Sequence, residues 1–324
     1  MKYLPKIALV LTLLSISKCI GEAIPDSDGR LYFSINHHSE SSQKPMQTTP
    51  VVPHQDQAVP PRVTTPQVVP SPVTPSKLSL VEQKKLGLVP ILGIQVDSVT
   101  PGLVQKVIDQ YVKFREWYDN FNKTIGGVYK FAPDGYIYYG AEQRGLHFYD
   151  AKKFGKELAN TYGVSVAATV GGVKSTFACS ETPFQATKIN LLLDNGQAQT
   201  FIHQFRNATG GAIQRDVGPR IQAIAQSTGK TVNAQFYQPW DDSSVWVMIN
   251  LVLGKALQNQ NDPMIYQLIH KMPKFLIVEH TGNDDKWGDG SKLDPSILGP
   301  GENRLGLIWA AVQTTLKDYY QVPN

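Results

Sequence analysis

Apolar residues recur every three or four positions through much of the C-terminal two-thirds of the chain, which is the spacing of one helix face. Thr100 and Pro101 precede one such stretch, over residues 103–121, and suit the N-cap and first position of a helix. Gly126-Gly127 should end this helix. The same spacing predicts helices over 245–256, 264–269 and 305–316, and mixed patterns predict others around 199–206 and 221–227.

Short strands are predicted between these helices. Residues 136–139 are an aromatic, strand-like run, and residues 164–170 and 173–177 flank Gly171-Gly172 in the pattern of a hairpin. Residues 275–279 form another apolar run of strand length. Because helices dominate and the strands are few and short, we expect a helix-rich α+β fold.

The N-terminus has the pattern of an export signal. Lys2 and Lys6 give a positive start, residues 7–16 are mainly apolar, and Gly21-Glu22-Ala23 offers small residues for cleavage after Ala23. An apolar run of ten residues is too short to span a bilayer, which requires about 20. An uncleaved anchor or a buried helix is the alternative. We therefore expect a signal peptide over residues 1–23, a secreted or periplasmic protein, and no transmembrane segment after cleavage.

The next segment has the composition of a linker. Residues 41–76 contain many Pro, Thr, Val and Gln residues and no aromatic residue, so they cannot bury enough surface to offset the entropy of ordering. We expect a disordered Pro/Thr-rich linker over residues 24–77. Folded sequence should begin near Leu78, with a helical extension over residues 78–134 and a larger C-terminal domain over residues 135–324.

Charge, cysteine and histidine content exclude several classes of site. A net charge of +4 is too small to indicate a nucleic acid or an anionic membrane as a stable partner. Signal cleavage would leave Cys179 as the only cysteine, which excludes an internal disulfide and leaves either a buried apolar residue or a free thiol. The only close histidine pair, His37-His38, lies in the predicted linker, and no metal-ligand spacing occurs elsewhere. Residues 171–175 lack the glycine that precedes the lysine of a phosphate loop. We expect neither a metal nor a cofactor.

Candidate chemistry is concentrated near the C-terminus. The strand over 275–279 runs into a Gly-rich, acidic segment at 282–290, and Gly301 to Gly306 lead into the last helix. Glycines allow close approach to a ligand, free N–H groups at a helix start attract phosphate or ribose oxygens, and Arg304 adds a forked donor. A tight structural turn with solvated charges is the alternative.

Several blocks in this region resemble the NADAR (YbiA-like) family of N-glycosidases. The C-terminal block comprises Val-Glu-His-Thr at 278–281, Asn283-Asp284, Trp-Gly-Asp-Gly at 287–290 and Asn-Arg-Leu-Gly at 303–306. Residues 180–188 resemble the start of a family helix, Trp240 ahead of Met248 resembles a third block, and Tyr138-Tyr139 is similar to the opening strand. The resemblance covers residues 135–318. Thr182-Pro183 and the long segment 291–300 depart from the family pattern, which puts the substrate in doubt more than the chemistry.

The resemblance implies cleavage of the bond between ribose or ADP-ribose and a nitrogen base such as guanine or a ribosylamine. Two carboxylates commonly serve glycoside hydrolysis, and Glu181 and Asp284 are the candidates here. Lys188 follows Glu181 by two helical turns, and the family suggests a Schiff base with opened ribose. The expected catalytic residues are therefore Glu181, Lys188 and Asp284, and the expected substrate-binding residues are Trp240, Trp287, Gly288, Asp289, Asn303 and Arg304.

Two functions remain open from the sequence. The first is a secreted hydrolase whose substrate is a ribosylated or ADP-ribosylated base, free or within nucleic acid. The second is an inactive module that binds ADP-ribose or a nucleotide in the same pocket. In both cases Glu181, Lys188, Trp240 and Asp284 should converge, with Asn303 and Arg304 closing the site.

Overall fold

The computed structural model describes residues 23–25, 31–33, 78–125, 130–131, 135–139, 142–148, 154–274, 276–281, 284–291 and 299–323. The chain divides into two units, Met1–Pro66 and Gln67–Asn324. In the first unit, β1 (Ala23–Pro25) pairs with β2 (Leu31–Phe33) in an antiparallel ladder. This pair was not expected in a linker over 24–77. The predicted signal sequence up to residue 22 and the proline-rich stretch 41–76 lie outside the described residues.

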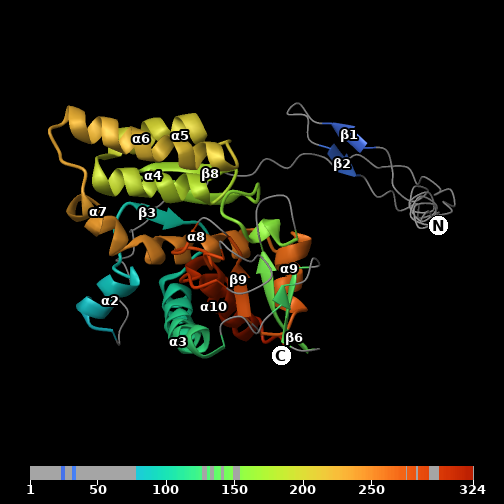
Figure 1. Ribbon diagram of the computed structural model, residues 1–324. Helices are drawn as coiled ribbons and strands as arrows, with labels where there is room; N and C mark the ends of the chain where they lie inside the picture. The colour runs from blue at the N-terminus through green and yellow to red at the C-terminus, as the bar shows by residue number, and fades with distance from the viewer. Residues whose placement is uncertain are drawn as a thin grey trace, which may run out of the picture. The chain divides into compact units, whose positions relative to one another are not determined.

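The second unit confirms the predicted helix-rich α+β class (Figure 1). Its helices are α2 (Leu80–Leu86), α3 (Pro101–Ile125), α4 (Glu181–Leu192), α5 (Asn195–Phe205), α6 (Gly211–Ser227), α7 (Ala234–Asp241), α8 (Ser244–Gln258), α9 (Pro263–His270), α10 (Arg304–Tyr319) and the short η1 (Lys156–Leu158). Its strands are β3 (Ile94–Val96), β4 (Lys130–Phe131), β5 (Tyr136–Tyr139), β6 (Glu142–Phe148), β7 (Val166–Val170), β8 (Val173–Phe177) and β9 (Leu276–Glu279).

Helix α8 forms the centre of this unit. Figure 1 shows it with α4, α5 and α6 on one side and α3, α10 and β9 on the other. Its residues are buried from Ser244 to Ala256, as expected for a helix that is apolar on every face. Helix α10 is likewise buried from Arg304 to Lys317 and packs against α3, α8 and β9. The core therefore consists mainly of helix against helix, with the sheets packed at its edges.

Two small sheets complete the unit. One has the order β3-β7-β8, in which the predicted β7–β8 hairpin turns at Gly171 and Gly172, with φ of 55° and 79°. The other has the order β4-β5-β6-β9. Strand β9 joins it parallel to β6, with Glu279 opposite Phe148. This pairing brings the end of β9, where the sequence predicts candidate site residues, beside a strand that is distant in the sequence.

The described residues between 78 and 131 pack with the rest of the second unit. Helix α3 packs against α10, β3 pairs with β7, and β4 pairs with β5. Thr100 caps the predicted helix start, where its Oγ1 accepts the Leu103 N–H at 3.4 Å. The apolar face of α3 buries Val107 and Tyr111 completely or nearly so. This face meets the C-terminal helix, so α3 belongs to the same compact unit as the residues after 134.

Candidate functional site

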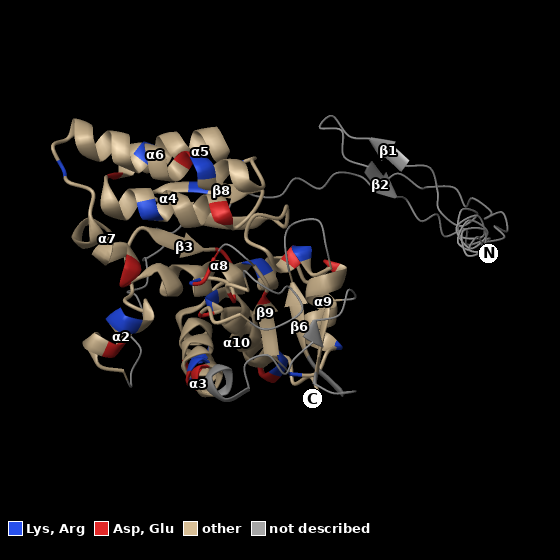
Figure 2. Cartoon of the chain, viewed as in Figure 1, with Lys and Arg blue, Asp and Glu red and all other residues tan. Residues whose placement is uncertain are grey.

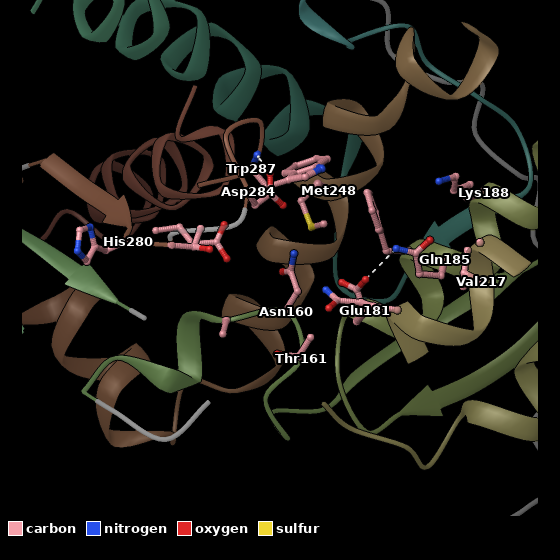
Figure 3. A pocket seen from close by; sticks show the side chains of 16 residues that line it. Asn160, Thr161, Glu181, Gln185, Lys188, Val217, Met248, His280, Asp284 and Trp287 are labelled. Carbon is pink, nitrogen blue, oxygen red and sulfur yellow. Dashed lines mark hydrogen bonds between the residues drawn. The ribbon is translucent and has the colours of Figure 1, made fainter. Parts of the chain in front are cut away.

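A cavity of about 630 Å³ lies between α4, α6, α8 and the end of β9 (Figure 3). This volume lies within the range of pockets that hold small ligands, about 300–1,000 Å³. Its walls combine carboxylates, amides, one lysine and apolar or aromatic side chains. The lining residues are Ala159, Asn160, Thr161, Glu181, Phe184, Gln185, Lys188, Gln214, Val217, Gly218, Met248, Glu279, His280, Thr281, Asp284 and Trp287.

Helix α4 supplies one wall because its first two turns direct one face inward. Glu181, Phe184, Gln185 and Lys188 are spaced by three and four residues, so they share that face. Helix α6 contributes Gln214, Val217 and Gly218 with the same spacing. In Figure 3, Lys188 lies at one end of the cavity and His280 at the other, with Glu181 and Asp284 between them.

The segment 159–161 closes the cavity between α4 and the core, and buried donors fix its backbone. The Asn160 carbonyl accepts the Glu181 N–H at 3.0 Å. The Ala159 carbonyl accepts a hydrogen bond from Lys255 Nζ at 2.9 Å, and the Leu158 carbonyl accepts one from Trp309 Nε1 at 2.8 Å. Burial lowers the pKa of Lys255 to about 8. Two core helices thus hold this wall by hydrogen bonds to successive carbonyls.

Glu181 begins α4 and is almost fully buried, with 3% of its surface exposed. Its Oε1 accepts a hydrogen bond from Gln185 Nε2 at 2.8 Å. Burial raises the pKa of Glu181 and the negative charge of Asp284 adds to this, although hydrogen bonds from Gln185 and Gln214 and the charge of Lys188 oppose it. A carboxyl with a raised pKa is suited to proton transfer near neutral pH.

Lys188 lies at the end of the cavity nearest the rings of Tyr237 and Trp240. Its Nζ is 5.0 Å from the ring centre of Tyr237 and 6.0 Å from that of Trp240, within the range of cation–π contact. Burial lowers the pKa of Lys188, against the opposing charges of Asp241 and Glu181. A lysine with a lowered pKa contains more of the neutral, nucleophilic amine at pH 7.

Three aromatic rings extend from α7 to the loop after β9. The rings of Trp240 and Phe184 are 4.7 Å apart, and those of Phe184 and Trp287 are 5.3 Å apart, both edge to face. Trp240 is only 6% exposed and lies behind Phe184, outside the cavity lining. Phe184 and Trp287 line the cavity, and Trp240 packs against Phe184, so its contact with substrate stays a prediction.

Asp284 lines the cavity and also shapes its own loop. Its Oδ1 accepts the backbone N–H groups of Lys286 at 3.0 Å and Trp287 at 2.8 Å. Lys286 Nζ in turn bonds Asp241 Oδ1 at 2.8 Å, which ties the loop to the end of α7. The structure thus brings together Glu181, Lys188, Asp284 and Trp287 of the predicted site.

Glu279 is a third carboxyl in the cavity that the sequence interpretation did not assign to the site. Its Oε2 is buried and has no hydrogen-bond partner among the residues that the structure describes. Burial raises the pKa of Glu279 to about 8, and the charges of Asp284, Glu181 and Asp289 act in the same direction. A sequence signal existed, because a glutamate that ends an apolar strand immediately before a Gly-rich loop is placed at a sheet edge where ligands bind.

Asn303 does not line the cavity but fixes the end of β9. It is fully buried and adopts φ of 50°, in the left-handed region. Its Oδ1 accepts the Glu279 N–H and its Nδ2 donates to the Ile277 carbonyl, both at 2.9 Å. The side chain therefore pairs with β9 as a neighbouring strand residue would. Contact of Asn303 with ribose or phosphate stays a prediction, and the observed partners of its side chain are the backbone groups of β9.

Asp289 and Gly288 also have structural positions. Asp289 is completely buried, and its carboxylate accepts from the Thr281 N–H at 3.0 Å and pairs with His280 Nδ1 at 2.8 Å. The Asp289 N–H donates to the Glu279 carbonyl at 2.9 Å. A side chain at Gly288 would place its Cβ 2.8 Å from that carbonyl oxygen, so glycine permits this approach. Neither residue is in the cavity lining, and their contact with substrate stays a prediction.

Arg304 lies at a different cavity. Its Nε donates to Glu302 Oε2 at 2.7 Å, and Arg115 Nη1 bonds the same carboxylate at 3.2 Å. These side chains and Tyr111 line a space of about 440 Å³ between α2, α3 and the start of α10. Arg304 thus joins α10 to α3 through Glu302, and its predicted role in closing the site stays a prediction.

Cys179 is buried and its Sγ contacts the Ala208 carbonyl at 3.5 Å, outside the cavity lining. Burial raises the pKa of the Cys179 thiol, which disfavours the reactive thiolate. Within the described ranges, no group of three or more His, Cys, Asp or Glu side chains is arranged to hold a metal ion. Figure 2 shows basic and acidic residues interspersed over the folded unit.

Comparison with known proteins gives no further assignment. No protein-family model, no curated protein and no solved structure matches this chain. In the part of the chain that the structure describes, no helix combines the length and apolar character needed to cross a membrane.

Proposed function

We propose that this protein is an N-glycosidase that hydrolyses the bond between ribose or ADP-ribose and a nitrogen base. The observation that carries the proposal is the presence of Glu181, Asp284, Lys188 and Trp287 around one cavity of about 630 Å³. These residues come from two distant parts of the sequence, and their chemistry matches the requirements of the reaction. The resemblance to the NADAR family motifs supports the same reaction.

Cleavage of an N-glycosidic bond passes through a sugar with oxocarbenium character, which a nearby negative charge stabilises. Asp284 is the residue for this role, because two backbone N–H groups hold its carboxylate at the cavity wall. Glu181 is the residue that accepts a proton from the attacking water, since its raised pKa suits proton transfer near neutral pH. Phe184 and Trp287 offer aromatic surface for the base or the sugar.

Lys188 has two compatible roles in this reaction. Its charge can bind a phosphate of an ADP-ribose group, and its neutral amine can form a Schiff base with the C1 aldehyde of opened ribose. Reduction with cyanoborohydride in the presence of substrate distinguishes them, because only the Schiff base yields a stable adduct. An adduct on a peptide containing Lys188, absent from Lys188→Arg, would establish the covalent role.

The proposed reaction is tested by incubating the full chain with DNA or nucleoside carrying ADP-ribosylated guanine and measuring released ADP-ribose. Glu181→Gln should lower turnover by about 10²–10⁴-fold, the usual range for loss of a general base. Glu116→Gln is the matched control, because Glu116 is exposed on α3. Binding of ADP-ribose without turnover by the unaltered protein would instead support the inactive binding module.

The sequence pattern at residues 1–23 supports action after export. Expression with the intact N-terminus, followed by mass determination of the mature chain, tests this proposal. A mature chain that begins at Ile24 in the exported fraction is the expected result.

A further inference from the structure

Glu279 differs from the other carboxyls of the cavity in its hydrogen bonding. Glu181 is bonded to Gln185, and Asp284 accepts two N–H groups. Glu279 Oε2 is buried and lacks a partner within the described part of the chain. Buried polar atoms are nearly always paired in folded proteins, so an exception at a cavity wall points to a ligand that completes the bonding.

The backbone of Glu279 is fixed from both sides. Its N–H donates to Asn303 Oδ1 and its carbonyl accepts the Asp289 N–H, each at 2.9 Å. Glycine at position 288 allows the loop to pass close to that carbonyl. The motif residues expected to contact substrate thus fix the backbone of Glu279 at the cavity wall, which limits where its carboxyl can meet a bound group.

The surroundings of Glu279 favour its neutral form. Glu181 and Lys188 face the cavity from α4, and Asp284 faces it from the loop after β9. Asp289, on the same loop, is buried and pairs with His280. The ring of His147, on the adjacent strand β6, contacts that of His280 with centres 5.8 Å apart. Burial first, and then the charges of Asp284, Glu181 and Asp289, raise the pKa of Glu279 to about 8. The protonated carboxylic acid, with one O–H to donate, is therefore favoured at neutral pH.

We propose that Glu279 is the catalytic acid that protonates the departing nitrogen base, an inference that rests on the N-glycosidase proposed above. As the C1–N bond breaks, its electron pair remains with the base, and the Glu279 proton moves to that nitrogen. Water oxygen bonds to C1, and Glu181 takes the proton that the water loses. Exchange with solvent returns both carboxyls to their starting forms. The net reaction converts the N-riboside and one water into a ribose with a C1 hydroxyl and the free base, whose nitrogen now carries a hydrogen.

This assignment defines the substrate class. A neutral base such as a purine leaves poorly as an anion and requires a proton, whereas 4-nitrophenolate leaves readily without one. A resident acid is therefore of value for purine-type N-ribosides and of little value for a 4-nitrophenyl riboside. The cavity should favour the former class.

The test compares the unaltered full chain with Glu279→Gln on two probes, an ADP-ribosylated guanosine and 4-nitrophenyl β-D-ribofuranoside. Turnover of the guanine substrate should fall by about 10²–10⁴-fold, and turnover of the nitrophenyl riboside by less than about tenfold. The rate of the unaltered chain on the guanine substrate should also decline above pH 8, and this decline should be missing from the residual activity of the variant. Glu279→Asp, which keeps a carboxyl, and thermal unfolding of each variant separate chemistry from folding.

Guanine turnover within tenfold of the unaltered chain, or an equal loss on both probes in a folded variant, would overturn the role of Glu279 alone. If the nitrophenyl riboside is not a substrate, the pH profile on the guanine substrate decides. A variant whose rate still declines above pH 8 would then overturn the role of Glu279. Absence of turnover of both probes by the unaltered chain would overturn the proposed function and this inference with it.

Discussion

Replacement of Glu279 by Gln should stabilise the protein at neutral pH, although it removes a group from the candidate site. The folded-state pKa is about 8, against an ordinary value of 4.5. The folded state thus keeps a proton that the unfolded state releases as pH rises above 4.5. The free energy of unfolding must therefore fall between about pH 4.5 and pH 8 because of this group.

The size of the effect follows from the difference between the two pKa values. At about 1.36 kcal/mol for each factor of ten in proton affinity, an unfolded-state pKa of 4.5 gives a cost of about 3 kcal/mol at pH 7. Solvent that reaches the cavity screens the charge, so we expect about 1–3 kcal/mol. Because the glutamine amide does not titrate, the free energy of unfolding of Glu279→Gln should not fall in this way as pH rises.

Urea unfolding monitored by tryptophan fluorescence at pH 5, 6, 7 and 8 measures the difference directly. The stability of Glu279→Gln relative to the unaltered protein should increase steadily from pH 5 to pH 8. Glu116→Gln, on the exposed face of α3, controls for a general change in net charge. Parallel stability curves for Glu279→Gln and the unaltered protein over this range would refute the placement of a protonated Glu279 in the cavity.

Three further predictions concern other parts of the chain. Asn303→Ala should lower the free energy of unfolding by about 1–3 kcal/mol, measured by urea unfolding, because it removes the partners of the Glu279 N–H and the Ile277 carbonyl. An unchanged stability would argue against the pairing of this side chain with β9. Cys179→Ser should leave turnover within a few-fold in a steady-state assay, and a loss of several orders of magnitude would contradict its structural role. Limited proteolysis with mass spectrometry should cut within residues 41–76 and leave a stable fragment that begins near residue 78, whereas protection of that stretch would show that it is packed.

The elements with regular apolar spacing could be predicted from the sequence, and others could not. Helices α8, α9 and α10 and the β7–β8 hairpin lie where the pattern placed them. Helix α6 begins about ten residues before the predicted 221–227, because its first turns are largely polar and contact the core through few residues. Helix α7 was missed, since Pro239 lies within it and its eight residues are too few to show a period.

The sequence could predict which site residues share a helix face, because side-chain spacing defines that face. It could not predict the role of a residue where that role depends on whether its side chain is buried. Glu181 and Lys188 are seven residues apart on one helix, so their common face could be inferred. The sequence does not reveal whether Asn303 bonds a ligand or a neighbouring strand, because the same amide serves either purpose. Glu279 was left out of the site because only the structure shows that its Oε2 is buried without a partner among the described residues.

The cavity wall that Lys255 and Trp309 hold through the carbonyls of Ala159 and Leu158 has a consequence for the discovery of ligands. Segments as far apart as 159–161 and 284–287 meet only when the core helices are in place. A molecule that binds between them must therefore stabilise the whole unit and not a single loop. At 100 times its dissociation constant, such a ligand adds about 2.7 kcal/mol to the free energy of unfolding. Melting temperature then becomes a substrate screen, in which nucleosides, nucleotides and ribosylated bases can be ranked before any product is detected.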